Sequence, residues 1–456
     1  MTKRPVSPAS LTPAPRRAPR QAPAPASSAT RRAPVSPAAP SAADPTFKML
    51  YVLAIIMIVD GHVGSSDYLD FNGLLRYQNY HIALFMFVSG YFLNLTRGCK
   101  EFLARKTMRL LVPLFLWNAA YGVLCWYLNR YQGFSLGGEF NLYNLLYAPL
   151  VDGHQFIYNM ASWFLVPLFL VQAIGFLILR PFAAPAASLT APRDAAPVFP
   201  SLKIPAASLT APVSPSLKIP AVLFFALALA LGCIALAYAP ENHGARTLAL
   251  TALRTLYFLP AFAFGFLYRH ALQKYDTVST PLYLFAVLAA LTCLTQKFPG
   301  YNHVPSWLDA VNAPALAIYA ISLLAILFWL RVARVLSPLL AKSRPLQYIA
   351  DHTFDIMMHH FAGFMLAKAL FLPFISAAAP ATSAAAASPL ASHTDTAADI
   401  AAALARIKSD IWYYPFPESG ETSAWLYIAI SIVIALTAGF TTRKIYAIIS
   451  QKLSHF

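Results

Sequence analysis

The sequence has little charge, and this deficit excludes an ordinary soluble domain. Only 11% of its 456 residues are charged, whereas 58% are hydrophobic and the mean hydropathy is +0.56. An average globular protein has about 25% charged residues. The chain therefore has too few polar side chains to cover its apolar surface, and lipid must cover part of it.

Cysteines are also few, and their spacing is uninformative. Cys99, Cys125, Cys233 and Cys293 form neither a CxxC pair nor a Cys/His ligand pattern. This excludes a disulfide framework and a structural zinc site of the usual kinds. We therefore expect no metal.

The N-terminus lacks the apolar core of a signal peptide. Residues 1–46 are rich in Ala, Pro and Arg, and this composition predicts a disordered, basic cytosolic tail. The chain turns apolar at Phe47, soon after Asp44 and Pro45. These two residues suit the N-cap and the first position of a helix.

Long apolar segments dominate the rest of the chain. A helix needs about 20 apolar residues to cross a hydrocarbon core, with a range of about 17–25. The candidate segments lie at roughly 47–63, 81–96, 108–128, 162–181, 221–239, 248–268, 281–296, 311–330, 346–372 and 423–442. The sequence therefore predicts an all-α fold, a polytopic bundle of about ten transmembrane helices.

The distribution of charge predicts the orientation of this bundle. The formal net charge is +16, and most Lys and Arg residues lie in the tail and in alternate loops. The positive-inside rule places those segments in the cytosol, so we expect both termini to be cytosolic. Because the charge follows topology, we expect membrane lipid and no nucleic acid as a partner.

Two low-complexity segments interrupt the predicted membrane domain, residues 47–450. Residues 184–220 contain repeats of PAASLTAP and SLKIPA, which predict a Pro-rich cytosolic linker. Residues 375–420 are rich in Ala and Ser and are predicted to be an external insert, with a short helix at 397–409. We expect neither segment to carry chemistry.

Ionisable residues near the ends of the first two segments are the first functional candidates. Asp60 and His62 close the first segment, and His81 opens the second. Because these segments are predicted to be antiparallel neighbours, both histidines fall at the same outer level. Two imidazoles at one depth suit a general-base site. The alternative interpretation is that each simply meets water at the interface.

The segment 346–372 carries a second group of ionisable residues. His352, Asp355 and His359 recur at helical spacing, and His360 follows directly. Such residues inside a membrane usually face a polar cavity or join a hydrogen-bond network between helices. A metal site is the least favoured interpretation, because no second ligand cluster supports it.

Cations form the third group. Arg254 lies about two turns from the outer end of its segment, where it either neutralises an anion or extends to the interface. Arg105, Lys106 and Arg109 lie in the predicted cytosolic loop 97–109. They follow from the positive-inside rule alone, or they bind an anionic donor such as the phosphates of CoA.

Six motifs occur in order along the chain. They are IIMIVDGH (55–62), HIALFMFVSGYF (81–92), RKTMRLLVPLFLW (105–117), SWFLVPLF (162–169), YFLPAFAFGFLYR (257–269) and TFDIMMHH (353–360). The most specific is HIALFMFVSGYF, with its His, Phe and Ser89-Gly90 pair. Together they resemble the acyltransferase-3 family of integral membrane O-acyltransferases, and within it the fucose 4-O-acetylase-like branch. One departure is Tyr51, which stands where the family usually has a basic residue; the nearest one is Lys48.

The resemblance implies transfer of an acetyl or other short acyl group from cytosolic acetyl-CoA to a hydroxyl of an extracytoplasmic glycan or its lipid-linked precursor. It also implies a bacterial inner-membrane location and a role for His360. His62 is then the expected base, and His81 orients it or stabilises the oxyanion. Trp163 is expected to stack on a sugar ring, and Ser89 and Gly90 to allow close helix approach. The alternative function is a glycan or small-anion transporter.

Overall fold

The computed structural model describes residues 45–63, 71, 73–183, 215–240, 246–299, 301–378, 396–410, 412 and 421–453. The predicted N-terminal tail, most of the linker 184–220 and much of the insert 375–420 lie outside these residues. The described chain thus begins at Pro45, two residues before the first predicted apolar segment, and ends after the last one.

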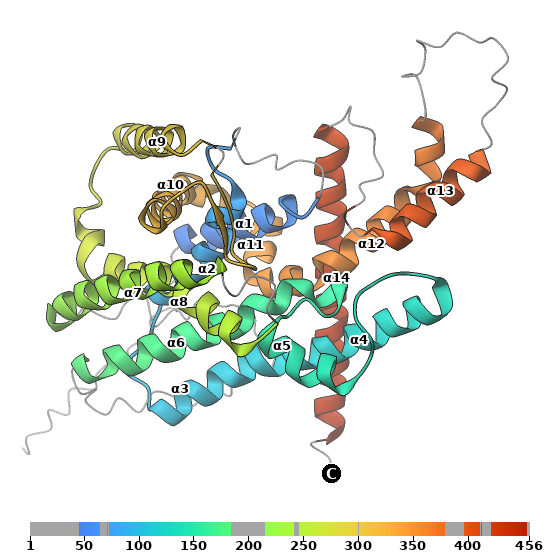
Figure 1. Ribbon diagram of the computed structural model, residues 1–456, viewed down its shortest axis with the longest axis horizontal. Helices are drawn as coiled ribbons and strands as arrows, with labels where there is room; N and C mark the ends of the chain where they lie inside the picture. The colour runs from blue at the N-terminus through green and yellow to red at the C-terminus, as the bar shows by residue number, and fades with distance from the viewer. Residues whose placement is uncertain are drawn as a thin grey trace, which may run out of the picture. The chain divides into compact units, whose positions relative to one another are not determined.

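Helices make up most of the described chain (Figure 1). They are α1 (Pro45–Asp60), α2 (His81–Tyr91), α3 (Cys99–Lys106), α4 (Val112–Gln132), α5 (Ala148–Val151), α6 (Leu165–Leu179), α7 (Lys218–Tyr238), α8 (Leu248–Leu267), α9 (Thr280–Lys297), α10 (Ala315–Lys342), α11 (Arg344–Asp351), α12 (Thr353–Ala378), α13 (Thr396–Ser409) and α14 (Glu421–Leu453). Every predicted apolar segment overlaps at least one of them. The predicted short helix at 397–409 is also present, as α13.

Helices long and apolar enough to cross a membrane confirm the prediction of a helical membrane bundle. Within the described residues they are Cys99–Gln132, Ile157–Phe182, Lys218–Tyr238, Leu248–Tyr275, Ala315–Lys342 and Ala424–Lys444. The first contains α3 and α4, joined by a π-helical turn at Thr107–Leu111. The helix α2, with 11 residues, is shorter than a standard span. A total of about ten spans and the cytosolic termini stay predictions.

The helices α2 and α8 approach each other closely because each presents a glycine to the other. A Cβ on Gly90 would lie 1.8 Å from the carbonyl oxygen of Phe262, and a Cβ on Gly265 would lie 1.9 Å from that of Phe87. In lipid, where apolar burial does not drive helix association, such close packing supplies the attraction. The two glycine contacts with α8 fix the position of α2 in the bundle.

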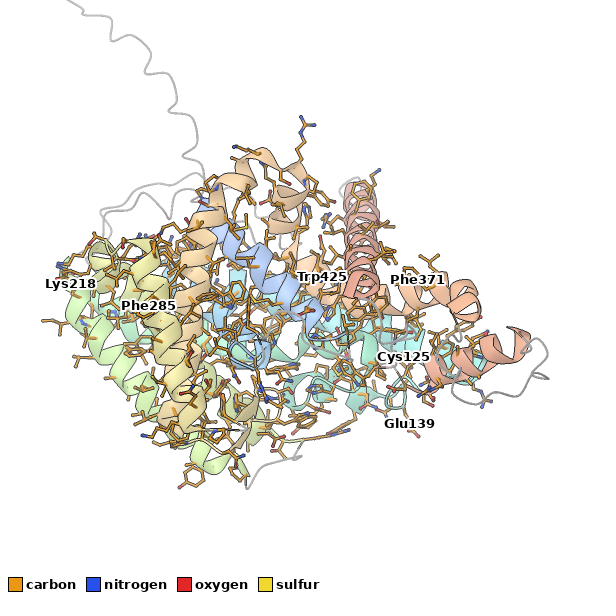
Figure 2. All side chains as sticks on the ribbon, turned by 90° about the horizontal axis from the view of Figure 1, so that it is seen from above. Cys125, Glu139, Lys218, Phe285, Phe371 and Trp425 are labelled. Atoms are coloured by element: carbon orange, nitrogen blue, oxygen red, sulfur yellow. The ribbon has the colours of Figure 1, made fainter. Side chains whose placement is uncertain are left out.

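Other contacts arrange the bundle around this pair. The helix α1 packs on α10, α7 on α8, and α12 on α14 (Figure 1). Large apolar side chains remain exposed on the outer faces, among them Phe285 of α9, labelled in Figure 2, which is 71% exposed. Such exposure suits a face in contact with lipid.

The predicted segment 346–372 is two helices rather than one. The helix α11 ends at Asp351, and α12 begins at Thr353. Between them His352 leaves the helical conformation, with φ −125° and ψ 24°. Residues on the two sides of this break therefore do not share a continuous helical face.

A short antiparallel hairpin, β1 (Asn302–Val304) and β2 (Asp309–Val311), joins α9 to α10. The prediction of an all-helical chain did not include it. Leu308 and Asn312 adopt positive φ values of 57° and 62° as the chain turns. The Arg254 guanidinium of α8 donates to the Ser306 carbonyl, with a distance of 2.7 Å from Nε. This contact holds the hairpin against α8.

Candidate active site

A cavity of about 250 Å³ brings three histidines together. They come from three segments of the chain: His62 follows α1, His81 begins α2, and His154 follows α5. The cavity is lined by Ile58, His62, Gln78, His81, Ile82, His154, Met160, Ala161, Trp163, Phe164, Val304, Pro305, Ser306, Trp307, Met357 and Trp412. Three imidazoles and three indole rings thus face one space.

His62 is held in place from two sides. Its Nδ1 lies 2.5 Å from the carbonyl oxygen of Ile58, one turn earlier, which places the ring proton on Nδ1. The ring stacks on Trp412, with centroids 5.8 Å apart and planes at 17°. This arrangement makes the other nitrogen of His62, Nε2, the basic one.

His81 is the first residue of α2, and only 6% of it is exposed. It lines the same cavity as His62. The structure thus brings together the two histidines that the sequence placed at one level.

His360 lies directly behind His62, with ring centroids 5.2 Å apart. It is fully buried in α12, and its Nδ1 lies 2.8 Å from the Met357 carbonyl oxygen. Its Nε2 has no hydrogen-bond partner among the described residues. His360 does not line the cavity. Asp60, the last residue of α1, is also buried without lining it.

Asp152 and His154 form a pair that the sequence analysis did not identify. The His154 Nδ1–H donates to the Asp152 carboxylate over 2.9 Å. The Asp152 side chain is 1% exposed, and Arg246 lies 3.2 Å from its second oxygen. The sequence signal for this pair is an Asp-Gly-His triplet, which lies in a connection between two apolar segments.

The protonation states of this pair follow from its surroundings. Burial acts to raise the pKa of Asp152, but the hydrogen bond from His154 and the nearby charges of His154, Arg246 and Arg254 outweigh it and lower that pKa. Burial lowers the pKa of His154 below 6.5, against the opposing effect of Asp152. At neutral pH the pair is therefore a carboxylate beside a neutral imidazole.

Trp163 and Trp307 form one wall of the cavity with His154, and Arg254 packs against the Trp163 ring. The His154 ring stacks on Trp307 (4.9 Å, 20°) and on Trp163 (6.2 Å, 20°). The Arg254 guanidinium lies 4.7 Å from the Trp163 ring centre, and its Nη1 donates to the Asp152 carbonyl oxygen over 2.9 Å. Trp163 lines the cavity, whereas Arg254 does not, and substrate binding by either residue stays a prediction.

The remaining candidates of α12 face other helices. Asp355 pairs with Arg443 of α14. His359 meets the Tyr121 hydroxyl of α4 at 2.5 Å and the Trp117 ring at 4.4 Å. Their contacts are those of a network between helices, and neither residue lines the cavity.

The predicted donor-binding residues also lie away from the cavity lining. Arg105 pairs with Glu101 at 3.2 Å, and the Lys106 ammonium lies 5.5 Å from the Phe102 ring centre. The Nε of Arg109 is buried and has no hydrogen-bond partner among the described residues. The side chains of Arg105, Lys106 and Arg109 therefore still have N–H groups that could donate hydrogen bonds to an anion. Ser89 is partly buried beside the Gly90 contact described above.

Lys48, the nearest basic residue to Tyr51, is engaged elsewhere, because it pairs with Asp351 at 2.8 Å. No group of three or more His, Cys, Asp or Glu side chains within the described chain could hold a metal ion.

These features define a multi-pass helical membrane protein with a histidine-lined cavity. Residues 49–444 match the family described as an acyltransferase domain (acyltransferase-3), and the chain belongs to this family. The protein is therefore a membrane acyltransferase, and the family resemblance drawn from the six motifs is confirmed. No curated protein and no solved structure matches the chain.

Proposed function

We propose that this protein transfers an acetyl or other short acyl group from cytosolic acyl-CoA to a hydroxyl of an extracytoplasmic glycan or its lipid-linked precursor. The fucose 4-O-acetylase-like motifs support the choice of a sugar hydroxyl. The proposed location is a bacterial inner membrane. The observation that carries the proposal is that His62 and His81, from the first two helical segments, line one cavity.

The chemistry needs a base in such a cavity. A sugar hydroxyl is a poor nucleophile, and a positioned imidazole that takes its proton contributes about 10²–10⁴ in rate. The basic Nε2 of His62 suits this role, or else it attacks the thioester itself and carries the acyl group. His81 is placed to orient the reacting groups or to stabilise the oxyanion.

The aromatic walls suit the acceptor. Trp163, Trp307 and Trp412 all line the cavity, and flat indole rings bury the apolar face of a sugar while their edges stay polar. Arg105, Lys106 and Arg109 are the proposed site for the phosphates of CoA, which pair well with guanidinium groups.

The test compares wild-type protein with His62→Ala in membranes supplied with labelled acetyl-CoA. We expect loss of label in the polysaccharide fraction by about 10²-fold or more, with unchanged polysaccharide export. The matched control is His352→Asn, because His352 stacks on Tyr348 away from the cavity. Full transfer by His62→Ala would remove His62 from this role, and loss of export instead of acylation would identify a transporter.

A further inference from the structure

His62 and His154 each offer a basic ring nitrogen in the cavity, whereas deprotonation of the acceptor needs only one base. His62 has its proton on Nδ1, at the Ile58 carbonyl, and His154 has its proton on Nδ1, at Asp152. Each ring therefore keeps one basic nitrogen, Nε2, while the acceptor hydroxyl has one proton to lose. The group that accepts the Nδ1 hydrogen bond of each ring then decides which ring takes the hydroxyl proton.

The partner of His154 is the better support for a positive charge. Asp152 is a buried carboxylate held ionised by its surroundings, so it stabilises the imidazolium that forms when His154 takes a proton. The Nδ1 partner of His62 is a neutral main-chain carbonyl. His154 is thus the stronger base, and His62 is left for another role.

The local backbone fixes the direction of the His154 ring. Gly153 adopts φ +78°, a conformation that L side chains rarely take. A Cβ at this position would lie 2.5 Å from the Cβ of Trp163. The turn therefore lies directly against Trp163, and the ring of His154 is stacked on this side chain and on Trp307. Such packing around a side chain at the cavity is typical of a preorganised catalytic group.

We propose that the Asp152–His154 pair is the general base for the acceptor hydroxyl, and that His62 is the nucleophile that carries the acyl group between two half-reactions. The proposal rests on the proposed function of the cavity. His154 lines the same cavity as His62, so both rings border the space in which the acceptor would bind.

The first half-reaction acylates His62. Its Nε2 forms a bond to the thioester carbonyl carbon, the C–S bond breaks, and CoA leaves as the thiolate. The ring keeps its Nδ1 proton and is a cation, which the Ile58 carbonyl stabilises through the hydrogen bond at Nδ1. The thiolate takes up a proton from water.

The second half-reaction transfers the acyl group. The acceptor oxygen bonds to the acyl carbon, the C–N bond breaks, and its electron pair returns to His62. The hydroxyl proton passes to His154 Nε2 and then to water, which replaces the proton taken by the thiolate. Asp152 stabilises the transient imidazolium at His154.

The experiment measures the two half-reactions separately with full-length protein in nanodiscs and in membranes. Exchange of tritiated CoA into acetyl-CoA without acceptor reports acylation of His62. Transfer of labelled acetyl to the polysaccharide fraction of membranes reports both steps. We expect His154→Asn to keep exchange within about twofold and to lose transfer by about 10²-fold or more. His62→Ala should lose both.

A second variant tests the same role independently, in case His154→Asn does not fold. Asp152→Asn keeps a side chain of the same size but removes the carboxylate charge. The groups that face His154 electrostatically are then His62, Arg254 and the exposed Arg246. Without Asp152 the imidazolium is less stable, so transfer should fall and its acid limb should move to lower pH, while exchange stays unchanged.

The outcomes are distinct. Wild-type protein that transfers acetyl without exchanging CoA overturns the two-step scheme and leaves the proposed function standing. Transfer by His154→Asn above a tenth of the wild-type rate overturns the role of His154, as does an unchanged pH profile in Asp152→Asn. Parallel loss of exchange and transfer in both variants also overturns it. Wild-type protein with neither activity refutes the proposed function itself.

Discussion

Replacing Gly153 with Ala should disturb the turn that positions His154. The residue has φ +78°, where a side chain costs about 1–2 kcal/mol. The new Cβ would also lie 2.5 Å from the Cβ and 2.6 Å from the Cα of Trp163. Relieving such overpacking costs about 1–3 kcal/mol. We therefore expect destabilisation of about 2–5 kcal/mol in total, or displacement of the turn.

Gly133 provides a matched control for this substitution. It has a similar φ, +68°, as the residue that ends α4, but a Cβ there would meet nothing within 4 Å. Gly133→Ala therefore suffers only the backbone strain, about 1–2 kcal/mol. The difference between the two variants isolates the contact with Trp163.

The assay follows thermal unfolding of both purified variants by tryptophan fluorescence, together with acetyl transfer. Gly153→Ala should unfold at a lower temperature than Gly133→Ala and lose most of its transfer, while Gly133→Ala keeps it. If the two variants unfold at the same temperature and transfer equally well, the turn does not position His154.

Three further predictions concern other parts of the chain. Gly90→Ala places a Cβ against the Phe262 carbonyl and should abolish folded, monodisperse protein, whereas Gly98→Ala, with nothing within 4 Å, should not; size-exclusion chromatography tests this. Arg109→Ala should raise the KM for acetyl-CoA more than it lowers kcat, and equal effects on both would argue against donor binding. Because burial lowers the pKa of His154 below 6.5, transfer should be constant above about pH 6.5 and fall as the ring protonates; a fall toward higher pH instead would contradict this.

The same pKa shift has a consequence for stability. The unfolded chain binds a proton at His154 at a higher pH than the folded chain does. The stability contributed by the neutral ring is therefore fully present above about pH 6.5 and is lost as the pH falls through the lowered pKa of the folded state.

The sequence alone determined the helical bundle, because apolar length and alternation are local properties. A segment such as Leu248–Leu267 must be helical in lipid, where only internal hydrogen bonds satisfy its backbone. Because successive membrane helices are antiparallel, the sequence also predicted His62 and His81 at one level of the membrane. The family was also predicted from motifs that occur in order along the chain.

Only the tertiary structure decided which other side chains reach the cavity. His154 comes from a short turn after α5, and its neighbour Trp307 comes from the tip of a hairpin about 150 residues away. Asp355 meets Arg443 because α12 packs on α14. Such pairs depend on how distant helices meet, and no local pattern of polarity or spacing specifies that.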